Sequence, residues 1–279
     1  MKASPPGAVV LDTSAVKVLV ADPSRHRVLQ SLTTCDLELL PSAINVLEIL
    51  KYENARKRDQ LLRAIAAAVG HRWLLPLPRD LLRQVGRALI EHRTEFVTEP
   101  SGFEWVVREP ERIRPKHIAM ARDALNRNEI ALREAHRFGR RRIRDLLRKQ
   151  AVNDPWGSIG AFLEHQWTTL PMLGDTIERL WSQMGFASPP PSGLLLGDEA
   201  WRLYFEGTGA TVYERCVPDQ TLKPAHATDV VQLAYLASRR RRVFVTDDAA
   251  LTRVANAVLR GRYPQTRVLS VSELLALAG

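Results

Sequence analysis

The sequence has few cysteines and no long apolar run. It contains two cysteines in 279 residues, Cys35 and Cys216, and neither has a second cysteine or a histidine at metal-ligand spacing. We therefore expect reduced thiols and no zinc site. No apolar run approaches the roughly 20 residues that span a bilayer, and the first residues lack the charged-then-apolar pattern of a signal peptide. These absences predict a cytoplasmic protein with no membrane contact.

Catalytic histidine pairs are also missing. The seven histidines are scattered, and none pairs with a serine or cysteine in the way that a nucleophilic triad requires. Acyl transfer is therefore poorly supported. A phosphatase with an aspartyl nucleophile is also disfavoured, because it needs a second aspartate two residues after the first, and the chain has Ser14 two residues after Asp12.

What the sequence does contain is an alternation of short apolar runs and helical patterns, in a chain that is 45% hydrophobic. This alternation predicts an α/β fold with a parallel sheet. We expect strands at 8–11, 37–41, 72–77, 242–246 and 267–271. We expect two short helices within 15–32 and further helices at 43–52 with Ser42 as N-cap, at 56–69 ending near Gly70, at 80–92, at 225–237, at 249–259 and at the C-terminal end.

The alternation stops between residues 93 and 218, which we interpret as an inserted helical region. Trp181 within it is expected to be a core residue. Near its end we expect a short helix, Asp198 to Phe205, closed by Gly207 and Gly209.

The centre of this region concentrates the positive charge of the chain. Residues 112–150 carry 13 Lys and Arg against four acidic residues, an excess equal to the +9 of the whole sequence. A solvated helix face and an acidic, antitoxin-like protein partner are two explanations, but the imbalance favours phosphate contact with a nucleic acid. The residues proposed for it are Arg137, Arg140, Arg141, Arg142, Arg144, Arg148 and Lys149.

Two of the expected strands end in acidic residues. Asp12 follows the first strand, and Thr246, Asp247 and Asp248 follow the strand that begins at residue 242. The carboxyl ends of parallel strands share one edge of a sheet, where α/β proteins bind ligands, so we expect these acids to lie together. Each acid taken singly has a simpler explanation, because an aspartate at these places is also an ordinary helix N-cap.

Two more acids lie on expected helices. Glu48 stands among apolar residues of helix 43–52, where a buried carboxylate would need a cation to stay charged. Asp229 lies near the start of helix 225–237, where Thr228 or Asp229 could again be a simple cap.

The set Asp12, Glu48, Asp229 and Thr246-Asp247-Asp248 resembles the four-acid pattern of PIN domains. Within that family it is similar to the toxin-type ribonucleases, whose late strand ends in Thr, any residue, then Asp. By that pattern Asp248 is the fourth acid, and Ser14 matches the small polar residue two positions after the first.

The resemblance implies a three-layer α/β/α fold with a central parallel sheet. It covers residues 1–92 and 219–279, which would form one discontinuous nuclease domain, and the basic insertion 93–218 departs from it.

Such a site implies a metal-dependent endoribonuclease. Clustered carboxylates cannot all stay ionised without cations, and hard oxygen ligands select Mg²⁺ or Mn²⁺, which hydrolyse phosphodiesters in two-metal sites. The implied ligands are Asp12, Glu48, Asp229 and Asp248, with Asp247 assisting, and Thr13, Ser14 and Thr246 would position RNA. The alternative is a non-catalytic module of the same fold that binds nucleic acid or protein. The sequence is also compatible with a homo-oligomer.

Overall fold

Four short strands form one parallel sheet in the order β2-β1-β3-β4. The central strands are β1 (Gly7–Leu11) and β3 (Arg242–Val245), and the edges are β2 (Leu37–Leu39) and β4 (Thr266–Leu269). Every residue of β1 and β3 is buried, as expected for a parallel sheet that helices cover on both faces. The expected mixed α/β fold with a parallel sheet is therefore confirmed.

The structure is a computed structural model that describes residues 7–20, 37–40, 42–69, 74–93, 101–126, 137, 141, 144–145, 156–167, 178, 180–187, 195, 197–216, 229–237, 242–259, 263 and 265–278. Its helical elements are α1 (Thr13–Val20), α3 (Ala43–Leu50), α4 (Ala55–Val69), α5 (Pro78–Ile90), α6 (Glu104–Arg108), η2 (Pro110–Arg112), α8 (Ile159–Phe162), η3 (Leu163–Trp167), α11 (Glu199–Cys216), η4 (Gln232–Leu236), α13 (Ala249–Leu259) and α14 (Val271–Ala278). Residues 115–126 are also helical.

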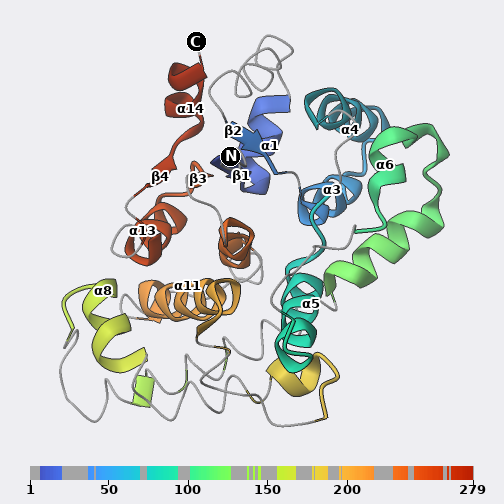
Figure 1. Cartoon of the computed structure of the whole chain (residues 1–279). Coiled ribbons are helices and arrows are strands. Elements are labelled where there is room, and N and C mark those ends of the chain that lie inside the picture. The colour runs from blue at the N-terminus through green and yellow to red at the C-terminus, as the bar shows by residue number, and fades with distance from the viewer. Residues whose placement is uncertain are drawn as a thin grey trace, which may run out of the picture.

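The sheet reverses its winding direction between β1 and β3. The chain runs from β1 outward to β2 on one side and from β3 outward to β4 on the other. Because such crossovers are right-handed, α1 and α13 cover opposite faces of the sheet. η4 packs against β1 and β3, and α11 packs against η4 and α13, so that α11 forms a further layer (Figure 1). A crevice at such a reversal, beyond the carboxyl ends of the strands, is where α/β folds bind ligands.

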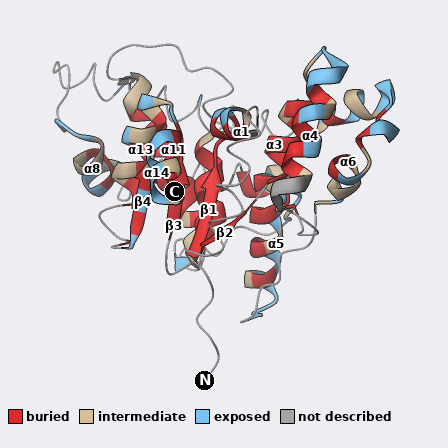
Figure 2. Cartoon of the chain, turned by 90° about the horizontal axis from the view of Figure 1, so that it is seen from above, coloured by how far each residue is buried: buried red, intermediate tan, exposed pale blue. Residues whose placement is uncertain are grey.

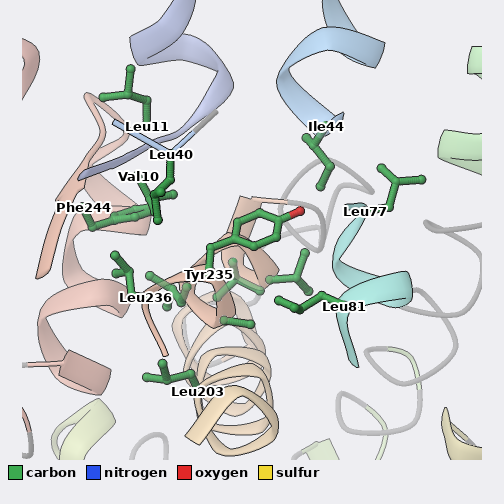
Figure 3. Packing of buried hydrophobic residues seen from close by; sticks show 14 of the residues in the cluster. Val10, Leu11, Leu40, Ile44, Leu77, Leu81, Leu203, Tyr235, Leu236 and Phe244 are labelled. Carbon is green, nitrogen blue, oxygen red and sulfur yellow. The ribbon is translucent and has the colours of Figure 1, made fainter. Parts of the chain in front are cut away.

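The apolar core runs continuously from the sheet into the helices on either side. Figure 2 shows the central strands β1 and β3 buried along their length and exposed positions on the outer sides of helices such as α4 and α6. In Figure 3, Tyr235 of η4 lies among core residues from β1, α5 and α11, and its hydroxyl donates to the Pro76 carbonyl oxygen at 2.5 Å. Trp181 is almost fully buried, as expected.

The local signals around α3 are confirmed. Ser42 caps this helix in a reciprocal capping box, because its side chain accepts from the Asn45 N–H and the Asn45 side chain accepts from the Ser42 N–H. The second short helix expected within 15–32 and the helix end expected at Gly70 lie outside the described residues.

The strand expected at 72–77 is wrong for its described part. Leu75 makes only an isolated bridge to Ser42, and its carbonyl oxygen accepts from the Ala43 N–H at 2.9 Å. Pro76 and Pro78 lack the N–H groups that a sheet ladder needs, so the segment cannot extend the pairing.

The short helix expected to close at Gly207 and Gly209 is also wrong, because α11 continues through both glycines to Cys216. A Cβ on Gly207 would lie 2.8 Å from Val230 Cγ2. The glycine therefore lets α11 approach the segment that begins at Asp229.

No helix in the described part of the chain is both long and apolar enough to cross a bilayer.

Candidate functional site

Asp12 lies buried at the carboxyl end of β1. Its N–H donates to the Val245 carbonyl oxygen at 3.0 Å, which extends the pairing of β1 with β3. Its carboxylate accepts from Ser14 Oγ at 2.9 Å, from the Ala15 N–H at 2.6 Å and from Thr246 Oγ1 at 2.6 Å. Asp12 is therefore the cap of α1, as the simpler explanation proposed, and it is also tied to the end of β3.

Burial raises the pKa of Asp12, and the negative charge of Asp247 adds to the rise. The hydrogen bonds from Thr246, Ala15 and Ser14 act in the opposite direction without outweighing burial. A nearby cation would favour the charged form of this carboxylate.

Thr246 joins the two strand ends. Its buried hydroxyl donates to Asp12 and accepts from the Asp248 N–H at 3.1 Å. Asp248 caps α13 through Oδ1, which accepts from the Ala250 and Leu251 N–H groups at 2.7 and 2.9 Å. Among the described residues, no hydrogen-bond donor reaches Asp248 Oδ2. One oxygen of this carboxylate therefore orients it, and the other is available to a ligand.

The neighbouring polar residues have structural contacts of their own. Asp247 is exposed, and its Oδ1 accepts from the Val271 N–H at 3.0 Å at the start of α14. Thr13 is buried, and its hydroxyl accepts from Asn45 Nδ2 at 3.3 Å. Ser14 is exposed and donates to Asp12. Thr13 thus connects the β1–α1 turn to α3, whereas Ser14 lies at the open side of the Asp12 carboxylate.

Asp229 brings the four predicted acids into one electrostatic environment. Its pKa is raised well above the ordinary value of 3.8, first by burial and then by the negative charges of Glu48, Asp12 and Asp248. These three carboxylates come from α3 and from the ends of β1 and β3. Residues separated by more than 200 positions therefore act on a single side chain.

Lys17 is a site residue that sequence reasoning missed. Its Nζ lies 4.0 Å from Glu48 Oε2, and its positive charge lowers the pKa of Asp229. It supplies the cation that a glutamate among apolar residues was expected to need. No sequence signal marked it, because Lys17 follows Asp12 by five residues, a spacing that does not place two residues on one helix face.

A small hollow of about 20 Å³ adjoins the acids, and Asp229 and Asp248 line it on one side. The other side comes from α11, which contributes Thr211, Glu214 and Arg215. Glu214 accepts from Arg253 Nε at 2.7 Å. Sequence reasoning placed α11 in the insertion and attached no site residue to it. Only the packing of α11 on α13 could reveal this wall.

The basic stretch is described at three of its predicted contact residues. Arg137 and Arg141 are helical and exposed, and Arg144 is helical and partly buried. The other four, Arg140, Arg142, Arg148 and Lys149, lie outside the described residues. Contact with nucleic acid stays a prediction for the whole set.

The donor set fits a hard divalent cation in its chemistry, because it consists of carboxylates, and the charges of Glu48, Asp12 and Asp248 add to the effect of burial in raising the pKa of Asp229. Within the described residues, no group of three or more His, Cys, Asp or Glu is spaced to hold a metal ion by itself. Mg²⁺ is commonly held by one or two carboxylates, waters and substrate phosphates, so a set without three converging ligands can still serve it. Asp229 and Asp248, which line the same hollow, are the carboxylates that would hold it.

No family model, curated protein or solved structure matches this chain. The functional argument therefore depends on the geometry and charge of the site itself.

Proposed function

We propose that this protein is a PIN-like, Mg²⁺- or Mn²⁺-dependent nuclease that cleaves RNA internally. One feature carries the proposal: Asp229 is close enough to Glu48, Asp12 and Asp248, near the carboxyl edge of a parallel sheet, that their charges add to the effect of burial in raising its pKa. Structural carboxylates are usually paired with basic groups or hydrogen-bond donors. A carboxylate that neighbouring carboxylates destabilise is instead typical of sites that bind cations.

Hydrogen bonds orient two of the four acids, and the other two add negative charge to the site. Three donors fix the Asp12 carboxylate, and the first N–H groups of α13 fix Asp248. Asp229 and Glu48 come from separate elements and complete the negative charge. A bound Mg²⁺ or Mn²⁺ would supply neutralisation of this charge and activation of water for attack on a phosphodiester.

The second candidate function is a non-catalytic module of the same fold that binds nucleic acid or protein. The cap roles of Asp12, Asp247 and Asp248 favour it, because each aspartate has a structural use that needs no metal. Capping does not account for the charges gathered around Asp229, and for this reason we favour the nuclease.

The test is cleavage of a labelled single-stranded RNA by the purified protein with Mg²⁺, with Mn²⁺ and with EDTA. We expect metal-dependent cleavage, and loss of at least about a hundredfold in rate for Asp248→Asn, the scale of removing one charged group from a catalytic site. Asp123→Asn is the matched control, because Asp123 is exposed on the helix 115–126. A contaminating ribonuclease would be recognised by activity that persists in Asp248→Asn and does not depend on Mg²⁺ or Mn²⁺. Equal rates for wild type and Asp248→Asn would refute the proposal.

A further inference from the structure

Two lysines from different helices lie over one aromatic ring beside the acids. Lys17 of α1 has its Nζ 5.5 Å from the centre of the Tyr52 ring, and Lys57 of α4 has its Nζ 5.4 Å from the same centre. Tyr52 lies between α3 and α4 and is partly exposed, and Lys57 is exposed. The ring attracts each of the two ammonium groups by a cation–π interaction, so both are kept close to Tyr52.

The two lysines differ in their partners. Lys17 Nζ also lies 4.0 Å from Glu48 Oε2, so it faces the acids. Lys57 has no carboxylate partner among the described residues. Both ammonium groups lie near one ring, so an anion bound at its edge would be attracted by two positive charges. The surrounding sequence is also basic, since residues 51–58 contain four Lys and Arg and one acidic residue, Glu53.

We infer that Lys17, Tyr52 and Lys57 form a phosphate-binding surface that guides the backbone of RNA into the acid site. The inference rests on the proposed function and names the part of the substrate that this surface holds. A polyanion approaching four carboxylates is repelled, and a pair of cations at their border offsets that repulsion. Because Lys17 lies near both Tyr52 and Glu48, a phosphate bound at Lys17 and Lys57 would be adjacent to the acid site. Tyr52 acts as a positioning residue that keeps the ammonium groups together.

The experiment measures binding of a fluorescent 12-residue oligouridylate in EDTA at several salt concentrations, together with single-turnover cleavage in Mg²⁺. Lys57→Met is the main variant, because Lys57 contacts no member of the acid site. We expect affinity to fall about threefold to tenfold, the effect of losing one charged contact, and the salt slope to decrease by about 0.7, the value for one phosphate of a single strand.

Tyr52 and a distant arginine supply the controls. Tyr52→Phe retains the ring face and should bind as wild type does, whereas Tyr52→Leu should weaken binding. Arg267→Gln removes the same charge from an exposed position on β4, at the opposite edge of the sheet from β2, and should leave affinity and slope close to wild type.

The outcomes separate the two proposals. If Lys57→Met behaves as Arg267→Gln does, the phosphate-binding surface is refuted, whether or not RNA is cleaved. If Lys57→Met weakens RNA binding while wild type cleaves nothing, the surface stands and the nuclease fails. If wild type does not bind the oligonucleotide at all, both are overturned, and an acidic protein becomes the better partner for these lysines.

Discussion

At the scale of single residues, ionisation of Asp229 lowers the free energy of unfolding. Its pKa in the native protein lies above the ordinary value because burial and three carboxylates disfavour its ionised form. The native state therefore binds more protons than the unfolded state between the two pKa values, and the free energy of unfolding decreases as pH rises through that window.

Asp229→Asn should therefore stabilise the metal-free protein at neutral pH. We expect the thermal midpoint in EDTA to rise by roughly 2–4 °C, the shift that about 1 kcal/mol produces in a chain of this size. The gain should shrink as pH falls through the native pKa of Asp229 and disappear near 3.8. Calorimetry across this pH range measures both effects.

Asp123→Asn makes the same chemical change on an exposed helix and should shift the midpoint little. Mg²⁺ should raise the midpoint of wild type more than that of Asp229→Asn, because it binds only the native state. A midpoint that Asp229→Asn lowers at neutral pH would contradict the electrostatic account.

Thr246 should matter more for stability than its small size suggests. Thr246→Val removes the donor to Asp12 and the acceptor for the Asp248 N–H, both at a buried position. Leaving buried polar groups without partners costs about 1–3 kcal/mol. Urea unfolding should show a decrease of this size in the free energy of unfolding. The decrease should be largest at neutral pH, because the bond from Thr246 stabilises the ionised form of Asp12.

Thr252→Val is the matched comparison, because Thr252 donates a single bond to the Asp248 carbonyl oxygen one turn along α13. We expect a loss of less than about 1 kcal/mol for this variant. Equal losses in the free energy of unfolding for the two variants would mean that the Thr246 bonds to the acids stabilise the protein no more than the single bond of Thr252 does.

The sequence allowed the site acids to be named but not their contacts. Asp12 and Asp248 were identifiable because each follows a buried strand, and the order of strands then determines that they meet. Glu48 and Asp229 lie on helices, whose spacing in the sequence says nothing about distance. Lys17 and Thr211 were missed because the features that mark them, a neighbouring glutamate and a wall of α11, exist only in the folded chain.

At the scale of elements, the close approach of α11 to the segment beginning at Asp229 is set by Gly207. Gly207→Ala should destabilise the protein by about 1–3 kcal/mol, because its Cβ would lie 2.8 Å from Val230 Cγ2. Chemical unfolding measures this loss. In a double-mutant cycle, Val230→Ala should partly relieve it, giving a favourable coupling energy.

Gly160→Ala provides the control within another helix, where an added Cβ meets nothing within 4 Å. That variant should be neutral or slightly stabilising, since alanine is the better helix former. If Gly207→Ala were equally harmless, the packing of α11 beside Asp229 would be looser than described.

The same elements show where periodicity succeeds and fails as a predictor. The apolar runs of β1 and β3 and the repeat of α13 are local features, and each was predicted within about one residue of its bounds. The run 72–77 looks equally apolar, but strand pairing also needs N–H groups, which its prolines lack. The predicted end of α11 was wrong because we interpreted its glycines as signals of a helix end. Gly207 instead allows a neighbouring segment to pack closely against the helix, and the helix continues.

At the scale of the whole molecule, the charges are segregated. The acids gather at the carboxyl edge of the sheet, whereas the excess of positive charge lies in residues 112–150. On our proposal, a polyanion binds to the basic part of the chain and is cleaved at the acids. This separation predicts that affinity and chemistry can be removed independently.

The last prediction tests that separation with four arginines of the basic stretch. Replacing Arg140, Arg141, Arg142 and Arg144 by Gln should weaken binding to RNA of any sequence and flatten its salt dependence, because fewer counterions are released. The single-turnover cleavage rate at saturating protein should change much less, since these residues would position substrate without touching the reacting phosphate. Asp248→Asn should do the reverse, sparing affinity while abolishing hydrolysis. If the fourfold variant binds RNA with unaltered affinity and salt slope, the positive charge of this stretch serves an acidic protein partner instead.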